Sequence, residues 1–76
     1  MKMQEAIGRT AGAIWQSLNE HGELSLPTLK KRIDAKSPVF DWAIGWLARE
    51  DKLVITPHQK SYHVRLNDAQ GRTAGA

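Results

Sequence analysis

The apolar residues in the first third of the chain recur every three or four positions, which is the spacing of one helix face. They are Ile7, Ala11, Ile14 and Leu18, with Trp15 beside them. This pattern predicts an amphipathic helix over residues 3–20. Gly22 follows the stretch and can adopt the positive φ at which helices commonly end.

A second, shorter helix is predicted by a cap residue and an apolar stripe. Ser25 is a good N-cap, and Pro27 suits the first turn, where its missing N–H costs little. The buried stripe consists of Leu26, Leu29 and Ile33. Residues 22–25 form a short connection with a few strand residues before this helix, and residues 34–36 form the turn after it. The short turn predicts a helix-turn-helix.

The third predicted helix carries two of the three tryptophans. Ser37 is expected to be its N-cap, with Pro38 at the first helical position. Its apolar stripe comprises Val39, Ala43, Trp46 and Leu47, widened by Phe40 and Ile44. We therefore expect Trp15 and Trp46 to be core residues. Trp42 lies at the boundary of the stripe, where it either stacks on a partner or packs under the following segment.

A β-hairpin is predicted after the third helix, because residues 53–56 and 61–66 are β-branched and alternate in polarity. One face carries Leu53, Ile55, Tyr62, Val64 and Leu66. Residues 57–60 form a polar turn without glycine, which favours a loose loop over a tight two-residue turn. From Asn67 the chain is small and polar, and residues 67–76 are expected to be a flexible tail. The tail repeats residues 8–13 at 71–76, for which we have no physical explanation.

The composition predicts one soluble cytoplasmic domain. The chain has 76 residues, no cysteine and no apolar run long enough to span a membrane, so we expect no membrane partner. Its formal charge is +3, and this charge is unevenly distributed. Residues 25–36 and 52–66 each carry a net +3, whereas residues 37–51 carry −2. Positive charge therefore flanks the third helix.

The order of elements and one segment resemble a known family. The specific part is Gly45-Trp46-Leu47-Ala48-Arg49-Glu50-Asp51-Lys52, preceded by Ile14-Trp15-Gln16-Ser17-Leu18 in the first helix. Over about residues 5–66 the chain resembles a small prokaryotic winged helix-turn-helix family of uncharacterised function. The resemblance implies an α+β fold of three helices plus a C-terminal β-hairpin wing in residues 1–66. It also implies membership of a DNA-binding superfamily and a homodimer.

The cations predict contact with DNA phosphates more than with bases. In a winged helix the third helix enters the major groove, and here its exposed face offers Arg49 as the one plausible base reader. The candidate DNA contacts are Lys30, Lys31, Arg32, Lys36, Ser37, Arg49, Lys60 and Arg65. These favour a DNA-binding protein of the transcription-regulator type. The alternative is that the lysines solvate an exposed face and the chain is a protein-interaction or dimerisation module.

Small residues mark a candidate interface. Gly8 and Gly12 each cost about 1 kcal/mol relative to alanine inside a helix, and such residues usually permit close backbone approach. That approach is either within the domain or across a dimer, unless glycine is simply tolerated near the N-terminus. Trp42 and Gly45 are the second interface candidates. The histidines are far apart or poorly matched, and no catalytic set can be assembled. We therefore expect no enzyme activity, metal, cofactor or small-molecule ligand.

Overall fold

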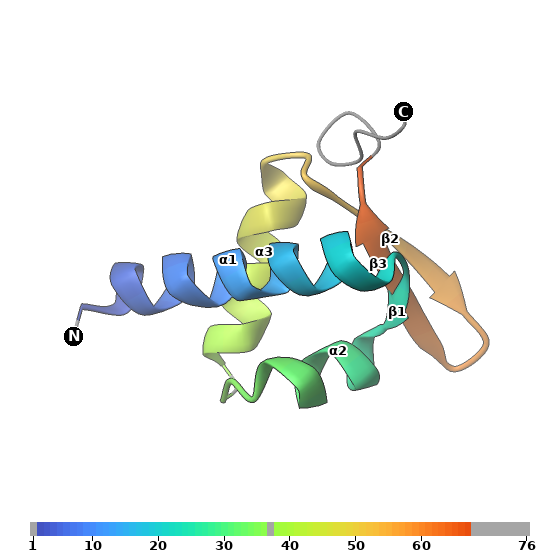
Figure 1. The fold of residues 1–76 in the computed structure, drawn as a ribbon, viewed down its shortest axis with the longest axis horizontal. Helices are drawn as coiled ribbons and strands as arrows, with labels where there is room; N and C mark the ends of the chain where they lie inside the picture. Colours follow the sequence, from blue (N-terminus) through green and yellow to red (C-terminus); the bar gives the residue numbers. More distant parts are fainter. Residues whose placement is uncertain (1, 37, 68–76) are drawn as a thin grey trace.

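Three helices and a three-stranded antiparallel sheet make up residues 2–36 and 38–67, which the computed structural model describes (Figure 1). In chain order they are α1 (Met3–His21), β1 (Leu24–Ser25), α2 (Leu26–Ile33), α3 (Val39–Arg49), β2 (Leu53–His58) and β3 (Ser61–Leu66). The expected α+β architecture of three helices and a C-terminal hairpin is confirmed. None of the helices in the described ranges is long and apolar enough to span a bilayer.

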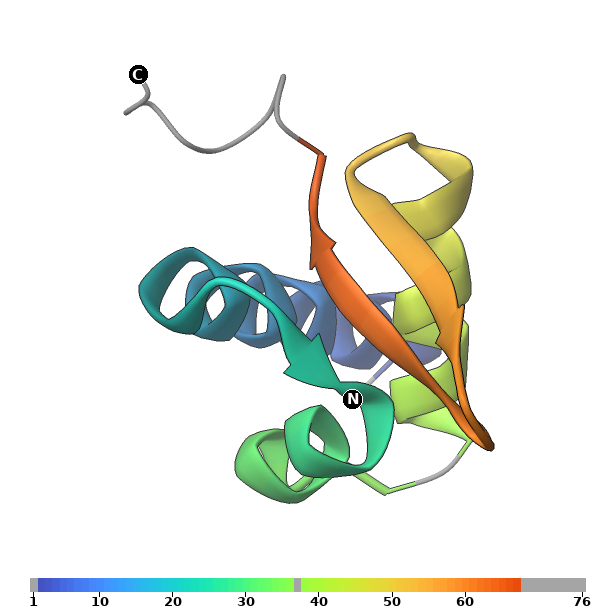
Figure 2. The same ribbon diagram turned by 90° about the vertical axis from the view of Figure 1, so that its right-hand side faces the viewer.

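The sheet has the strand order β1-β3-β2, so the short strand before α2 joins the outer side of β3 (Figure 2). Leu24 is opposite Val64, and Leu53 is opposite Leu66, as the predicted faces of the hairpin require. His58 is opposite Ser61, which leaves a loop of only Gln59 and Lys60. The prediction of a loose loop over residues 57–60 is therefore wrong.

The tight turn forms because Gln59 takes the conformation that glycine usually supplies. Its φ is 56°, a positive value at the first central position, as in the II′ turns that match the twist of hairpin strands. A non-glycine residue in the left-handed region costs about 1–2 kcal/mol. The pairing of two six-residue strands offsets that cost here.

The core lies where α1 crosses α3, with α1 also packed against β3 and α3 against β2 (Figure 1). Its buried residues are Ala11, Ile14, Leu18, Leu29, Phe40, Ala43, Ile44, Leu47, Leu53, Val64 and Leu66. Trp15 packs against this cluster while remaining partly exposed. The stripes predicted for the first two helices are thus confirmed, although Ile7, Leu26 and Ile33 are only partly buried. The predicted face of the hairpin is buried at Leu53, Val64 and Leu66, but Ile55 and Tyr62 on the same face are exposed.

Local signals place the helix ends. Gly22 follows α1 with φ of 83°, and its N–H donates to the Leu18 carbonyl at 2.8 Å. The Ser25 hydroxyl accepts from the Thr28 backbone N–H at 3.3 Å, which confirms it as the cap of α2. α3 begins at Val39, one residue later than predicted, with Pro38 in the cap position. The predicted cap Ser37 lies outside the described residues.

Trp46 corrects the predicted orientation of α3, because its side chain is 45% exposed. The buried positions are Phe40, Ala43, Ile44 and Leu47. These buried residues form a narrower stripe on α3 than the apolar residues of the sequence predict, and Trp46 lies at the edge of the buried stripe. There the Lys52 Nζ lies over the Trp46 ring, 5.8 Å from the ring centroid. The expectation of a core tryptophan at this position is wrong.

The described fold extends one residue past the predicted domain boundary. Asn67, assigned to the tail from its composition, donates from its backbone N–H to the Lys52 carbonyl and from Nδ2 to the Asp51 carbonyl, both at 3.0 Å. These two hydrogen bonds join the end of β3 to the turn after α3. The rest of the predicted tail, residues 68–76, lies outside the described residues.

Replacing Gly45 should stabilise the domain. Gly45 is exposed within α3, and a Cβ built there meets nothing within 4 Å. Gly45→Ala should add about 0.8–1 kcal/mol to the free energy of unfolding, or about 4–8 °C in melting temperature. Gly22→Ala is the opposite control, since its φ of 83° strains any side chain. A lower melting temperature for Gly45→Ala in thermal melts would contradict the placement of Gly45 at an exposed, open position of α3.

Candidate nucleic-acid interface

A shallow hollow lies where the start of α2, the start of α3 and the tip of the hairpin meet. Its volume is about 260 Å³, and it is lined by Leu26, Pro27, Lys30, Phe40, Asp41 and Ser61. Phe40 and Asp41 belong to the first turn of α3 and Ser61 is the first residue of β3, whereas the hairpin as a whole extends away from α3 (Figure 1). Residues from three separate parts of the sequence therefore border one surface.

One of the predicted DNA contacts lines this hollow, and a second is next in sequence to a lining residue. Lys30 is exposed on α2, with its Nζ 5.9 Å from the centroid of the Phe40 ring. Lys60 is exposed in the hairpin turn, next to Ser61, which lines the hollow. The hollow thus has a cation of the helix-turn-helix in its lining and, at its hairpin border, the residue that follows the cation of the hairpin turn. We call this region the α2–hairpin surface.

The other cations of the basic run do not line the hollow. Lys31, Arg32 and Lys36 are exposed. Successive helix residues are rotated by about 100°, so Lys30 and Arg32 point to nearly opposite sides of α2. Ser37 lies outside the described residues. Lys30 is therefore the member of the run that faces the hairpin tip.

Two further predicted contacts lie away from the hollow. Arg49 is exposed at the last residue of α3, about 12 Å along the helix axis from Asp41 at the hollow. Arg65 is half-buried on the outer face of the hairpin, opposite Val54, and its Nη1 donates to the Leu66 carbonyl at 3.4 Å. The predicted base reader and the α2–hairpin surface thus occupy different ends of α3.

The hairpin histidines are closer together than the sequence indicated. The rings of His58 and His63 stack with centroids 4.1 Å apart. The Nδ1 of His63 lies 2.7 Å from the Oε2 of Glu23, which precedes β1. The expectation that these histidines are poorly matched in position is wrong. Within residues 2–36 and 38–67, no three histidine and acidic side chains are grouped as metal ligands would be.

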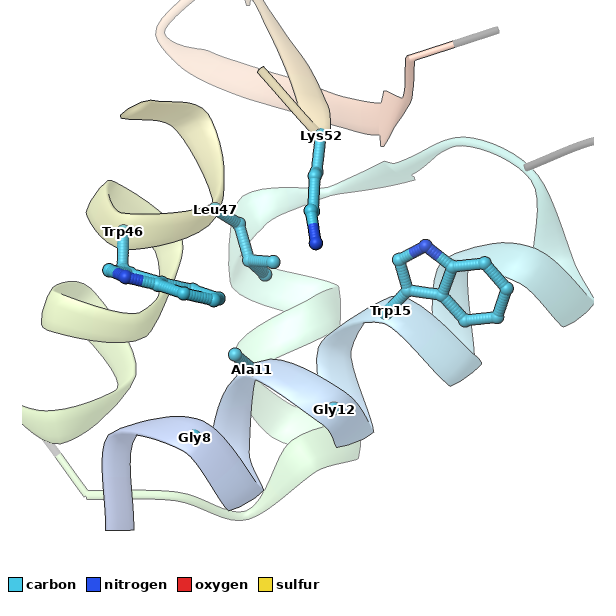
Figure 3. A pocket seen from close by; sticks show the side chains of 7 residues that line it. All are labelled: Gly8, Ala11, Gly12, Trp15, Trp46, Leu47 and Lys52. Atoms are coloured by element: carbon cyan, nitrogen blue, oxygen red, sulfur yellow. The ribbon is translucent and has the colours of Figure 1, made fainter. Parts of the chain in front are cut away.

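A second hollow, of about 350 Å³, lies between α1 and α3 (Figure 3). We call it the α1–α3 groove; it is lined by Gly8, Ala11, Gly12, Trp15, Trp46, Leu47 and Lys52. A Cβ built at Gly8 or Gly12 meets nothing within 4 Å. Close backbone approach within the domain, one of the explanations considered for these glycines, is therefore not what the structure shows.

The other predicted interface residues are also accessible. Trp42 is 47% exposed on α3, so about half of its side chain is accessible to a partner. Gly45 is exposed on the same helix, and a Cβ built there also meets nothing within 4 Å. Sequence reasoning missed Trp46 and Lys52 as surface residues of the groove. The wide apolar arc of α3 gave no signal that Trp46 would lie outside the core.

Comparison with known proteins supplies a family assignment. Residues 1–66 match the family model described as a winged helix-turn-helix domain (DUF2582). The chain is 41% identical over 63 residues to the uncharacterized protein MJ1608 of Methanocaldococcus jannaschii, covering 79% of this chain and 89% of that protein. The solution NMR structure of protein BT2368 from Bacteroides thetaiotaomicron is similar, with a TM-score of 0.74 and 29% identity, over 96% of this chain and 89% of that one.

Proposed function

The chain belongs to the winged helix-turn-helix family DUF2582, and from that premise we propose that it binds double-stranded DNA, mainly through phosphate contacts. The proposed contact region is the α2–hairpin surface together with the start of α3. The corresponding role is that of a cytoplasmic DNA-binding protein of the transcription-regulator type. The observation that carries the proposal is the convergence of Lys30 and Ser61, the residue after Lys60, on one hollow beside the first turn of α3.

This convergence suits a duplex because the phosphates lie on both sides of the groove that a third helix enters. Lys30 precedes α3 in the chain, and Lys60 follows it on the hairpin. Lys30 in the hollow and Lys60 beside Ser61 can therefore contact phosphates next to the groove that the first turn of α3 approaches. Such contacts position a protein on DNA without reading its sequence.

The exposed face of α3 supports weak base readout. Asp41 lines the hollow at the leading end, and a carboxylate there is repelled by phosphates. Trp42 and Gly45 offer no hydrogen-bonding group that discriminates all four base pairs. Arg49 is exposed at the far end of the helix and remains the proposed base contact. We therefore expect affinity to depend on salt more than on base sequence.

A salt titration with a short duplex tests the proposal. The logarithm of the binding constant should fall linearly with the logarithm of salt concentration, with a slope of about −0.9 per phosphate neutralised. Lys60→Ala should reduce the slope by about one contact. Lys2→Ala is the charge-matched control, because Lys2 precedes α1 at the end away from the hairpin (Figure 1). Its slope should equal that of the parent.

The outcome also separates DNA binding from the alternative of a protein-interaction module. That alternative is favoured by one observation, the exposure of Trp42 at 47% and Trp46 at 45% on the same helix. Exposed aromatic residues are typical of protein interfaces. No duplex binding at about 50 mM salt would reject the DNA proposal and favour the alternative.

A further inference from the structure

We propose that the α1–α3 groove is the contact of a two-fold homodimer, in which α1 of a second copy crosses α1 of the first in antiparallel orientation. This proposal does not depend on DNA binding, because the groove and the α2–hairpin surface have no lining residue in common. It extends the sequence-based expectation of a dimer through Gly8 and Gly12 by assigning the groove and the groups that pair across it.

The first observation is the open space over the two glycines. Gly8 and Gly12 are one turn apart in α1, both are exposed, and neither glycine is needed for packing within the chain. Glycine in a helix interior weakens the helix relative to alanine. Its absence of a side chain permits another backbone to approach closely. A helix laid across this part of α1 would meet no Cβ at either position.

The second observation is the aromatic border of that space. Trp46 projects from α3 over the α1 side of the groove, and Trp15 borders it further along α1 (Figure 3). The Trp46 side chain remains 45% exposed. Large rings beside an open groove are the anchors that interfaces bury. A second helix in the groove would cover this exposed part of Trp46.

The third observation is an unneutralised cation in the groove. The Lys52 side chain extends toward the space between Trp46 and Trp15 (Figure 3). Its Nζ lies 5.8 Å from the Trp46 ring centroid. The ion pairs found within residues 2–36 and 38–67 involve His21 and His63, and neither includes Lys52. The groove therefore fits a partner that brings an acidic group.

The register of an antiparallel pair identifies that acidic group within this chain. When Gly8 of one copy lies opposite Gly12 of the other, Glu5 lies opposite Trp15, because each is three residues outward from its glycine. Residues three apart share a helix face. Glu5 is exposed in the first turn of α1, and Trp15 lines the groove together with Lys52. Two-fold symmetry then forms the Glu5–Lys52 pair twice.

Sedimentation equilibrium of the full chain at tens of micromolar provides the first test. The expected mass is about twice the 8.5 kDa of the chain, decreasing on dilution. Gly12→Leu should give a monomer, since the added side chain occupies the space required by the second helix. Gly45→Leu is the matched control and should remain a dimer. A parent mass of 8.5 kDa at every concentration, or a dimer that tolerates Gly12→Leu, would overturn the proposal.

A charge exchange tests the proposed register. Glu5→Lys alone and Lys52→Glu alone should each raise the dimer dissociation constant by on the order of tenfold, because two attractive pairs become repulsive. The double variant restores both pairs and should return the constant to within a few-fold of the parent. Circular dichroism melts confirm that each variant folds. Failure of the double variant to recover dimerisation would reject the Glu5–Lys52 pairing and with it the antiparallel register.

Discussion

Phe40→Ala is expected to remove a large part of the free energy of unfolding. Phe40 is 1% exposed, at the centre of the cluster where α1, α3 and the sheet meet. Emptying a buried aromatic site costs about 3–5 kcal/mol. A domain of 76 residues has a total stability of about 4–11 kcal/mol. The melting temperature should therefore fall by more than about 12 °C in a thermal melt followed by circular dichroism.

Trp46→Ala is the matched control for this prediction. It also removes an aromatic ring from α3, but the Trp46 side chain is 45% exposed and lies outside the buried stripe. The free energy of unfolding lost in Trp46→Ala should be less than half of that lost in Phe40→Ala. The melts are made in dilute solution, where a dimer contact contributes little to stability. If Trp46→Ala were the more destabilising of the two, the orientation of α3 about its axis would be wrong.

Reversing two charges on the α2–hairpin surface should abolish measurable duplex binding. Lys30→Glu and Lys60→Glu together replace two attractions to phosphate by two repulsions. One contact at about 4 Å in water is worth about 1 kcal/mol. Each reversal replaces such an attraction by an equal repulsion, so two reversals change the binding free energy by about 4 kcal/mol. This corresponds to a loss of affinity of about a thousandfold. Fluorescence anisotropy with a labelled duplex measures the loss directly.

The control carries the same change in net charge on another element. Lys2→Glu and Arg9→Glu reverse two cations at and near the start of α1, and both residues are exposed. Their effect on affinity should be confined to a few-fold, because a separation beyond about 10 Å is largely screened in salt. Equal losses for the two double variants would show that overall charge, and not the α2–hairpin surface, governs binding.

The elements of the fold were predictable where one signal dominates. The α1 stripe repeats at a single spacing, and Ser25 followed by Pro27 marks the start of α2. The hairpin register follows from strict alternation, because a shift by one residue would expose Leu53 and Leu66. Each of these signals is local, so propensity and packing favour the same structure.

The sequence failed where two arrangements satisfy the same pattern. The apolar arc of α3 is wide enough to bury either Trp46 or Phe40 on its central line, and contact with α1 selects Phe40. Gln59 adopts a positive φ that its residue type disfavours, because strand pairing on both sides requires the turn. The orientation of α3 depends on contact with a helix distant in the chain, and the Gln59 turn depends on the pairing of the two strands that it joins.

The candidate site was predictable as a set of residues but not as a surface. The cations are apparent from composition, yet only the fold places Lys30 and Ser61, the neighbour of Lys60, at one hollow and Arg49 at the other end of α3. The pairing of His63 with Glu23, separated by 40 residues, likewise has no local signal. Charge counts identify candidate phosphate ligands, and tertiary packing determines which of them act together.

Mapping of backbone amide shifts by NMR during titration with a short duplex tests the proposed DNA contact most directly. At about 50 mM salt, binding should be measurable through its electrostatic contribution. The largest shifts should fall at Lys30, at the Gln59–Lys60 turn and at the first turn of α3. Shifts confined to the α1–α3 groove, or no shifts at all, would contradict DNA binding by the α2–hairpin surface.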